Sequence, residues 1–168
     1  MMSSTETKRY RICKSFEVES GHMLSKHAER CRFPHGHSRR IEVVLSAAHL
    51  DDHDMVCDFK AVKTAVGEYL DQFDHAMAIN SEDPFLPALR EASERVIVFD
   101  NTDPTTEIMA KAIFDFVEKR ISGDGTGEAR GSDGEEETAK GYQFPSGLRL
   151  ERIRVWETST SWAEYGVE

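Results

Sequence analysis

The sequence has few cysteines, no long apolar run and a deficit of positive charge, and each shortage excludes a class of protein. Three widely spaced cysteines in 168 residues do not make a disulfide framework, so a reducing cytoplasm is the expected setting. No apolar stretch approaches the about 20 residues of a membrane-spanning helix, and the first ten residues are polar, unlike a signal peptide. Basic residues number 21 against 31 acidic ones, and the resulting net charge of -10 argues against nucleic acid as a partner.

Length and composition predict one domain over residues 1–168, with two segments that lack core-forming residues. Residues 1–8 are expected to form a loose tail. Between residues 122 and 141, six positions are glycine, six are acidic and none is a large aliphatic or aromatic residue. That composition cannot offset the entropy of ordering, so residues 122–146 are predicted to form an insertion loop.

Histidine is concentrated in one short segment. Residues 22–37 contain four of the seven histidines and one of the three cysteines, a density that packing does not require. Apolar and polar residues alternate before and after this segment, which predicts two strands, and His22, His35 and His37 share the apolar parity. The three rings are therefore expected to face one interior. Three neutral nitrogens with an open fourth position are the ligand set of a catalytic zinc ion.

Other histidines fit this centre less well, and the nearby cysteine has two interpretations. His27 does not share the parity, and His49 and His53 lie in an Asp-rich turn, so all three are expected at the surface. Cys31 lies four residues before His35. It is either a reactive thiol beside the metal or the fourth ligand of a closed structural site.

The remaining pattern predicts an α+β fold in the order β-β-α-α-β-β. The predicted elements are strands at 10–22, 35–48, 148–157 and 161–167, helices capped by Asp58 and Asp103, a loop with one helical turn at 80–94, and a small strand at 95–99. The apolar parity changes between Leu150 and Ile153, which predicts a β-bulge in that strand.

Charge and parity also indicate the kind of ligand. Residues 22–40 carry five Lys or Arg residues and one Glu in an otherwise acidic chain, which favours an anion such as phosphate. Glu157 shares the inward parity of Ile153 and Val155. A carboxylate on that face pairs either with the donor edge of a guanine-like ring or with an arginine such as Arg154.

Six motifs in order give the sequence a family resemblance. They are FEVESGH, CRFPHGHS, DF at Asp58, LDQFDHAMAIN, DPTTE and VWETST. Together they resemble the 6-pyruvoyltetrahydropterin synthase family, which includes the bacterial 6-carboxytetrahydropterin synthases of the queuosine (7-deazaguanine) pathway. The resemblance implies a tunnelling fold, in which a four-stranded antiparallel sheet carries two helices on one face. It also implies assembly into a homo-oligomeric barrel, with a hexamer favoured and active sites at the interfaces.

The resemblance further implies a substrate and the residues that act on it. The substrate is 7,8-dihydroneopterin triphosphate, and the implied products are 6-carboxy-5,6,7,8-tetrahydropterin, acetaldehyde and triphosphate. One Zn²⁺ per subunit is implied on His22, His35 and His37, with Cys31 as the catalytic cysteine. The residues that accompany this cysteine fall on Asp74 and His75, and those that hold the pterin fall on Glu157, Thr105, Thr106 and Glu107.

Several alternatives stay open. From the residues alone, Asp74 and His75 are equally well explained as the cap of a turn and a histidine at a helix end. A 6-pyruvoyltetrahydropterin synthase, a non-catalytic pterin- or zinc-binding module and a structural zinc protein are the competing functions. The chain also departs from the family pattern at Arg39 and Arg40, where most relatives continue with an aromatic or aliphatic residue. Arg39 has the parity of the three histidines, so we expect it either to touch phosphate or to mark an altered substrate.

Overall fold

The structure, a computed structural model, describes residues 8–123 and 144–167. The tail predicted for residues 1–8 and the loop predicted for residues 122–146 therefore lie largely outside the described residues. Within the described ranges, no helix is both long enough and apolar enough to span a membrane.

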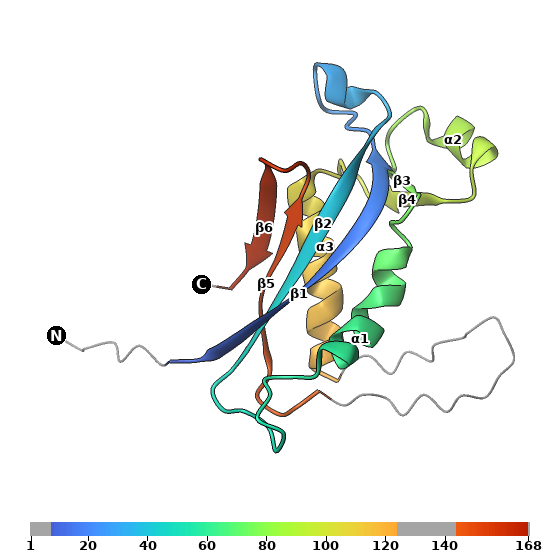
Figure 1. Cartoon of the computed structure of the whole chain (residues 1–168). Coiled ribbons are helices and arrows are strands. Elements are labelled where there is room, and N and C mark those ends of the chain that lie inside the picture. Colours follow the sequence, from blue (N-terminus) through green and yellow to red (C-terminus); the bar gives the residue numbers. More distant parts are fainter. Residues whose placement is uncertain (1–7, 124–143, 168) are drawn as a thin grey trace, which may run out of the picture.

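In the described part of the chain, six strands form one sheet in the order β4-β3-β1-β2-β5-β6 (Figure 1). The strands are β1 Tyr10–His22, β2 His35–Ala47, β3 Met77–Asn80, β4 Val96–Phe99, β5 Arg149–Trp156 and β6 Trp162–Gly166. The helices are α1 Phe59–Asp71, α2 Leu86–Ala92 and α3 Thr106–Ile121.

The predicted antiparallel framework is present. β1 pairs with β2 along its whole length, from Tyr10 opposite Ala47 to His22 opposite His35. β2 pairs with β5, and β5 with β6, both antiparallel. The register between β2 and β5 shifts after Val44 and leaves Glu151 as the additional residue, so the predicted bulge is confirmed.

The prediction of a four-stranded, wholly antiparallel sheet is wrong. β3 joins the end of β1 in parallel, and β4 joins β3 in parallel, which makes the sheet mixed. The small strand predicted at 95–99 is present as β4, whereas β3 was not predicted. Its four residues are too few to show alternation, and pairing with both neighbours creates the strand. Residues 86–92 form the helix α2, a third helix in the described residues, rather than one turn.

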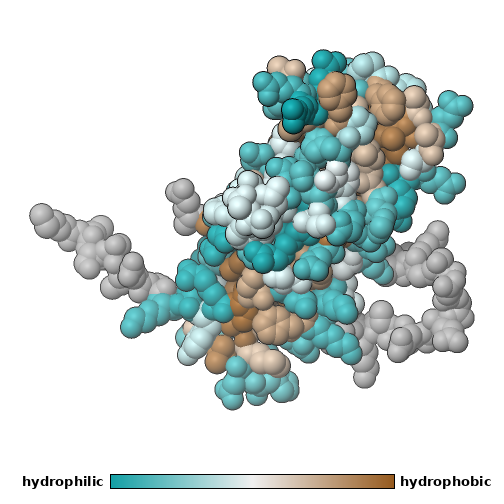
Figure 2. Space-filling view, turned by 45° about the horizontal axis from the view of Figure 1, so that its top comes forward, coloured by the Kyte–Doolittle hydropathy of each residue, from teal (hydrophilic) through white to brown (hydrophobic). Residues whose placement is uncertain are grey.

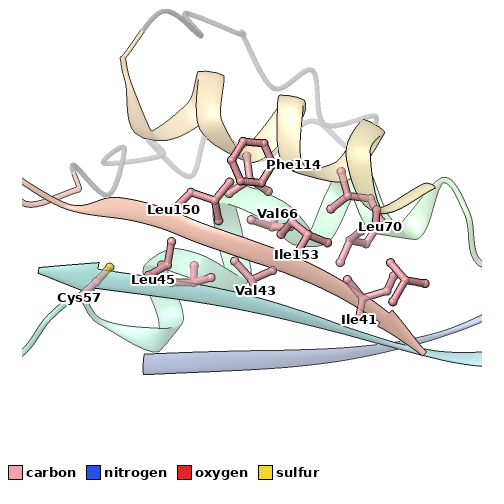
Figure 3. Close-up of a cluster of buried hydrophobic side chains, with 14 of the residues drawn as sticks. Ile41, Val43, Leu45, Cys57, Val66, Leu70, Phe114, Leu150 and Ile153 are labelled. Carbon is pink, nitrogen blue, oxygen red and sulfur yellow. The ribbon is translucent and has the colours of Figure 1, made fainter. Parts of the chain in front are cut away.

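Helices α1 and α3 cover one face of the sheet and enclose the core (Figure 1). Alternate strand residues such as Ile41, Val43 and Ile153 point into this layer and are at most 2% exposed. Val66 of α1 and Phe114 of α3 pack against them (Figure 3). Because the alternation continues to the ends of β1 and β2, it also decides on which face the terminal histidines lie.

One of the two predicted helix caps is correct. Asp58 caps α1, because its carboxylate accepts a hydrogen bond from the backbone N–H of Lys60. The cap of α3 is Thr105, whose hydroxyl accepts from the N–H of Ile108, so the cap predicted at Asp103 is wrong. The side chain of Asp103 is buried and accepts hydrogen bonds from other segments of the chain.

Candidate metal centre

Three histidines meet where the β1–β2 pair ends. His22 is the last residue of β1, and His35 and His37 lie at the start of β2, with His22 directly opposite His35 in the register. One possible ligand atom from each ring lies within 4.8 Å of the others. The ring centroids are 4.5 to 5.2 Å apart. The shared parity of the sequence is therefore a shared location in the fold.

Backbone carbonyl groups decide which nitrogen each ring presents. The Nδ1 of His22 lies 2.8 Å from the carbonyl oxygen of Pro104, and the Nδ1 of His35 lies 2.7 Å from that of Phe33. A carbonyl oxygen only accepts, so both Nδ1 atoms donate and each Nε2 keeps its lone pair. The Nε2 of His37 is buried and has no hydrogen-bond partner. The Nε2 of His22 lies 3.2 Å from a guanidinium nitrogen of Arg39 and accepts a hydrogen bond from it. The unpaired buried nitrogen of His37, beside the lone pairs of the other two rings, fits a bound metal ion.

Burial favours the neutral form of His22 and His37. It lowers the pKa of His22 from 6.5 to about 4, although the hydrogen bond to Pro104 favours the charged form. Burial also lowers the pKa of His37, and the positive charge of Arg39 acts in the same direction. Metals bind neutral imidazole, so these ligands are in their binding form at neutral pH.

The histidines open into a cavity of about 480 Å³, and Cys31 lines the same cavity from the loop between β1 and β2. The other lining residues are Leu24, His27, Thr105, Thr106, Glu107, Glu157, Ser161, Trp162 and Ala163. His27 is exposed, as predicted, but it borders this space. Among the described residues, the converging ligand atoms belong to the three histidines and exclude Cys31. The thiol therefore lies beside the cluster rather than within it.

Glu157, which follows β5, faces the cluster. Its Oε1 lies 3.6 Å from the Nε2 of His22 and 3.6 Å from that of His37. Burial alone would raise the pKa of this carboxyl group, but the hydrogen bond from Thr106 and the charge of Arg39 bring it below its ordinary value. The glutamate is thus held as a carboxylate at the wall of the cavity.

Arg39, not Arg154, is the arginine that pairs with this glutamate. A guanidinium nitrogen of Arg39 lies 3.6 Å from Glu157 Oε1, and the Arg39 side chain is 1% exposed. Its guanidinium group also donates to Ser20 Oγ at 3.1 Å and to Thr106 Oγ1 at 3.2 Å. Arg154 pairs instead with Glu164 at 2.8 Å. Because Arg39 is enclosed, it presents no surface to a phosphate group.

The start of α3 contributes the TTE segment to the cavity. Thr106 is 7% exposed and donates to Glu157 Oε1 at 2.9 Å. Thr105 and Glu107 line the cavity on either side of it. The preceding residue, Pro104, supplies the carbonyl oxygen that orients His22. One short segment thus contacts both His22 and Glu157.

Asp74 and His75 do not join this group within one chain. They lie in the turn after α1, where Asp74 Oδ1 accepts from the N–H of Glu19 and the N–H of His75 donates to the Glu19 carbonyl oxygen. The segment therefore borders the edge of β1 that faces away from β2. The His75 side chain is 75% exposed, lies 3.8 Å from Asp74, and neither residue lines the cavity.

Sequence reasoning did not identify some of the groups that support the site. The Pro104 carbonyl carries no sequence signal, because any residue supplies one. The partnership of Arg39 with Glu157 did have a signal, since both residues share the inward parity, but the sequence alone does not show which arginine is nearer.

The comparisons with known proteins agree with one another. The family described as 6-pyruvoyl tetrahydropterin synthase matches residues 11–168. The 6-carboxy-5,6,7,8-tetrahydropterin synthase of Aquifex aeolicus is 31% identical to this chain. The alignment covers 95% of this chain and 99% of the Aquifex protein.

Two solved structures share the fold. An uncharacterized protein from Wolinella succinogenes aligns with a TM-score of 0.73 at 20% identity, over 96% of this chain and 99% of its own. The 6-pyruvoyl tetrahydropterin synthase of Caenorhabditis elegans aligns with a TM-score of 0.60 at 16% identity, over 96% of this chain and 98% of its own. The family match and the near full-length relative together show that this chain belongs to the 6-pyruvoyl tetrahydropterin synthase family.

Proposed function

We propose that this protein is a lyase that converts 7,8-dihydroneopterin triphosphate and water into 6-carboxy-5,6,7,8-tetrahydropterin, with release of acetaldehyde and triphosphate. The name of the Aquifex aeolicus relative, which aligns over almost its full length, supports this product. The structural observation that carries the proposal is one cavity lined by the three histidines, Cys31 and Glu157. A place in the queuosine pathway and a cytoplasmic location follow from the same assignment.

We assign one Zn²⁺ per chain to His22, His35 and His37. Three converging imidazole nitrogens without a thiolate among them favour zinc in a catalytic rather than a structural role. Zinc bound there would supply Lewis acidity, which acidifies C–H bonds next to substrate hydroxyl groups and stabilises the negative charge that follows proton removal.

Glu157 is the residue that binds the pterin ring in this proposal. Its carboxylate can accept two hydrogen bonds from the exocyclic amine and the adjacent ring N–H of a guanine-like edge. The hydroxyl of Thr106 and the guanidinium group of Arg39 both contact Glu157 Oε1, so the orientation of the carboxylate is fixed before the ligand binds. Preorganisation of this kind reduces the entropy lost on binding.

Cys31 is the proposed base. Its thiol lines the cavity beside the histidines, where a thiolate can remove a proton from a side-chain carbon of the substrate. Lys26, Arg30 and Arg32 lie on the same exposed loop, and we assign them to the triphosphate. This loop thus combines the reactive group with the charges that hold the leaving group.

The proposed assembly gives Asp74 and His75 a role in the site. We propose a homo-oligomer, a hexamer by family resemblance, in which these residues from a second copy complete the cavity. Their exposure in the single chain agrees with such a role. Apolar side chains also lie exposed at the end of the molecule that carries the loop and α2, including Phe33 at 61% and Phe85 at 44% (Figure 2). Exposed apolar groups of this size favour contact with another protein surface.

Product identification tests the function directly. Zinc-loaded protein incubated with 7,8-dihydroneopterin triphosphate is expected to yield acetaldehyde and 6-carboxytetrahydropterin, detected by chromatography and mass spectrometry. Accumulation of 6-pyruvoyltetrahydropterin would assign the alternative enzyme, and the absence of turnover would favour a binding module. The Cys31→Ala variant should keep one zinc ion per chain and lose turnover. Loss of zinc in that variant would instead identify Cys31 as a structural ligand.

Subunit complementation tests the shared site. Cys31→Ala and His75→Ala proteins should each be inactive when assembled alone. After joint refolding, mixed oligomers contain interfaces that pair an intact Cys31 with an intact His75, so part of the activity should return. If the mixture stays inactive while native electrophoresis shows hybrid oligomers, the two residues do not serve one site across an interface.

A further inference from the structure

The loop between β1 and β2, residues 23–34, carries Cys31 but has little of its own to hold it in place. Most of its residues are exposed, and its only regular element is the short turn Arg30–Arg32. A base on such a loop needs an external anchor, because proton transfer depends on reaching the reacting carbon at hydrogen-bond distance.

The carboxylate of Asp103 supplies that anchor. Its Oδ1 accepts from Ser25 Oγ at 2.6 Å, and its Oδ2 accepts from the backbone N–H of Lys26 at 2.7 Å. The amide group of Asn80, at the end of β3, donates to Oδ1 at 2.9 Å. Asp103 is 6% exposed, so the bond from Asn80 is buried and the bonds from Ser25 and Lys26 are partly shielded from water. Two segments far apart in sequence are thereby joined through one side chain.

The anchor reaches Cys31 in one further step. Next to Ser25, the N–H of Leu24 donates to the carbonyl oxygen of Cys31 at 3.0 Å. On the other side, Asp103 directly precedes Pro104, whose carbonyl oxygen orients His22. The same carboxylate therefore lies between the segment that fixes the cysteine and the segment that fixes a metal ligand.

We propose that Asp103 is a positioning residue for the reaction, which sets the location of the Cys31 thiol relative to the three histidines by fixing Ser25 and Lys26. The expected change in kcat rests on the proposed function, whereas the expected change in the location of the Cys31 thiol does not. Asp103 itself lies outside the cavity lining, so it acts through the loop and not by contact with the substrate.

Asp103→Asn is the informative substitution because it preserves shape and removes one acceptor. The amide NH₂ must face either the N–H of Lys26 or the donors at Oδ1, which places two donors against each other. Asp83→Asn is the matched control. Asp83 is also 6% exposed, and its carboxylate accepts a backbone hydrogen bond from Phe85 at 2.8 Å rather than from residues 23–34.

Three measurements on the full-length, zinc-loaded protein test the proposal. In Asp103→Asn, kcat should fall about 10- to 100-fold with a smaller change in KM, because a displacement of about 1 Å can cost about 100-fold in rate. Alkylation of Cys31 by iodoacetamide, followed by peptide mass mapping, should be faster than in wild type. Zinc content should remain one per chain, and Asp83→Asn should match wild type in all three.

A second variant keeps the test decisive if Asp103→Asn folds poorly. Ser25→Ala removes one hydrogen bond to Asp103 and should change the alkylation rate and kcat in the same direction, to a smaller extent. The proposal is overturned if alkylation and kcat in both variants equal those of wild type. It is also overturned if Asp103→Asn loses zinc with no change in Cys31 alkylation. Because alkylation needs no substrate, an inactive wild-type protein would refute the proposed function while leaving this test intact.

Discussion

The substitution Glu157→Gln should destabilise the metal-free protein, because it leaves a buried cation without its carboxylate. The Arg39 side chain is 1% exposed, and its guanidinium nitrogen lies 3.6 Å from Glu157 Oε1. At that separation and an effective dielectric constant of about 20, the attraction is about 4–5 kcal/mol. The Glu157 side chain is 31% exposed and the glutamine keeps the hydrogen bond from Thr106, so solvent and the amide dipole recover part of this energy. We expect the free energy of unfolding to fall by about 2–4 kcal/mol, somewhat less than the about 3–5 kcal/mol for breaking a fully buried pair.

The double variant separates this cause from a general loss of packing. Arg39→Met, introduced into the Glu157→Gln protein, removes the unpaired charge and keeps an unbranched side chain of moderate size. Most of the lost stability should return, and the coupling between the two positions should be about 1–3 kcal/mol. Arg39→Met alone should cost less than Glu157→Gln, because a partly exposed carboxylate can turn to water while an enclosed guanidinium group cannot.

Thermal unfolding in the presence of a chelator is the appropriate assay. A zinc ion at the proposed site would add positive charge beside Glu157, and any bound ligand raises the melting temperature by mass action, so the proteins are compared without zinc or ligand. For a chain of this size, the expected loss lowers Tm by roughly 5–15 °C at matched protein concentration. A Glu157→Gln protein that melts within about 2 °C of wild type, or a double variant no more stable than that single variant, would refute the reasoning.

Three further outcomes are expected. Burial would raise the pKa of Asp103, but the hydrogen bonds from Ser25, Asn80 and Lys26 together lower it. The carboxylate therefore contributes stability that is lost as the pH falls below the ordinary value of 3.8. In this pH range, the urea midpoint of Asp103→Asn should vary less with pH than that of wild type. A Cβ at Gly166 would meet Arg152 Cβ at 2.6 Å, so Gly166→Ala should lower the free energy of unfolding in urea by about 1–3 kcal/mol. Gly67 of α1 has open space around it, so Gly67→Ala should raise the free energy of unfolding by about 0.5–1 kcal/mol. His37→Ala should weaken zinc binding, measured by chelator competition, by more than the about 10- to 100-fold of outer-shell changes, while His27→Ala leaves it unchanged.

Local periodicity was sufficient to predict the part of the fold that carries the histidines. β1 and β2 are long enough for alternation to be counted, and the bulge in β5 is visible as a change of parity. β3 has only four residues, and it exists because β1 and β4 lie on either side of it. Non-local pairing of this kind leaves no pattern in a short segment, so the sheet was predicted with too few strands.

The helix cap shows a different limit of sequence reasoning. Asp103 and Thr105 are both good capping residues, and both precede the apolar face of α3. The choice between them depends on contacts with Ser25, Lys26 and Asn80, which engage the aspartate and leave the threonine to cap the helix. Competition between equivalent local signals is settled by residues distant in sequence.

Strands position some residues of the candidate site, whereas an exposed loop positions Cys31. His22, His35 and His37 lie within paired strands, and Glu157 directly follows β5, so the sheet register fixes the proposed metal ligands and the proposed pterin anchor together. Cys31 lies on an exposed loop whose position depends on a few hydrogen bonds from outside it. Substitutions in the strands should therefore change metal and ligand affinity first, and substitutions at the loop anchor should change the rate first. That separation is the reason we expect a single buried aspartate, Asp103, to affect catalysis without contacting the substrate.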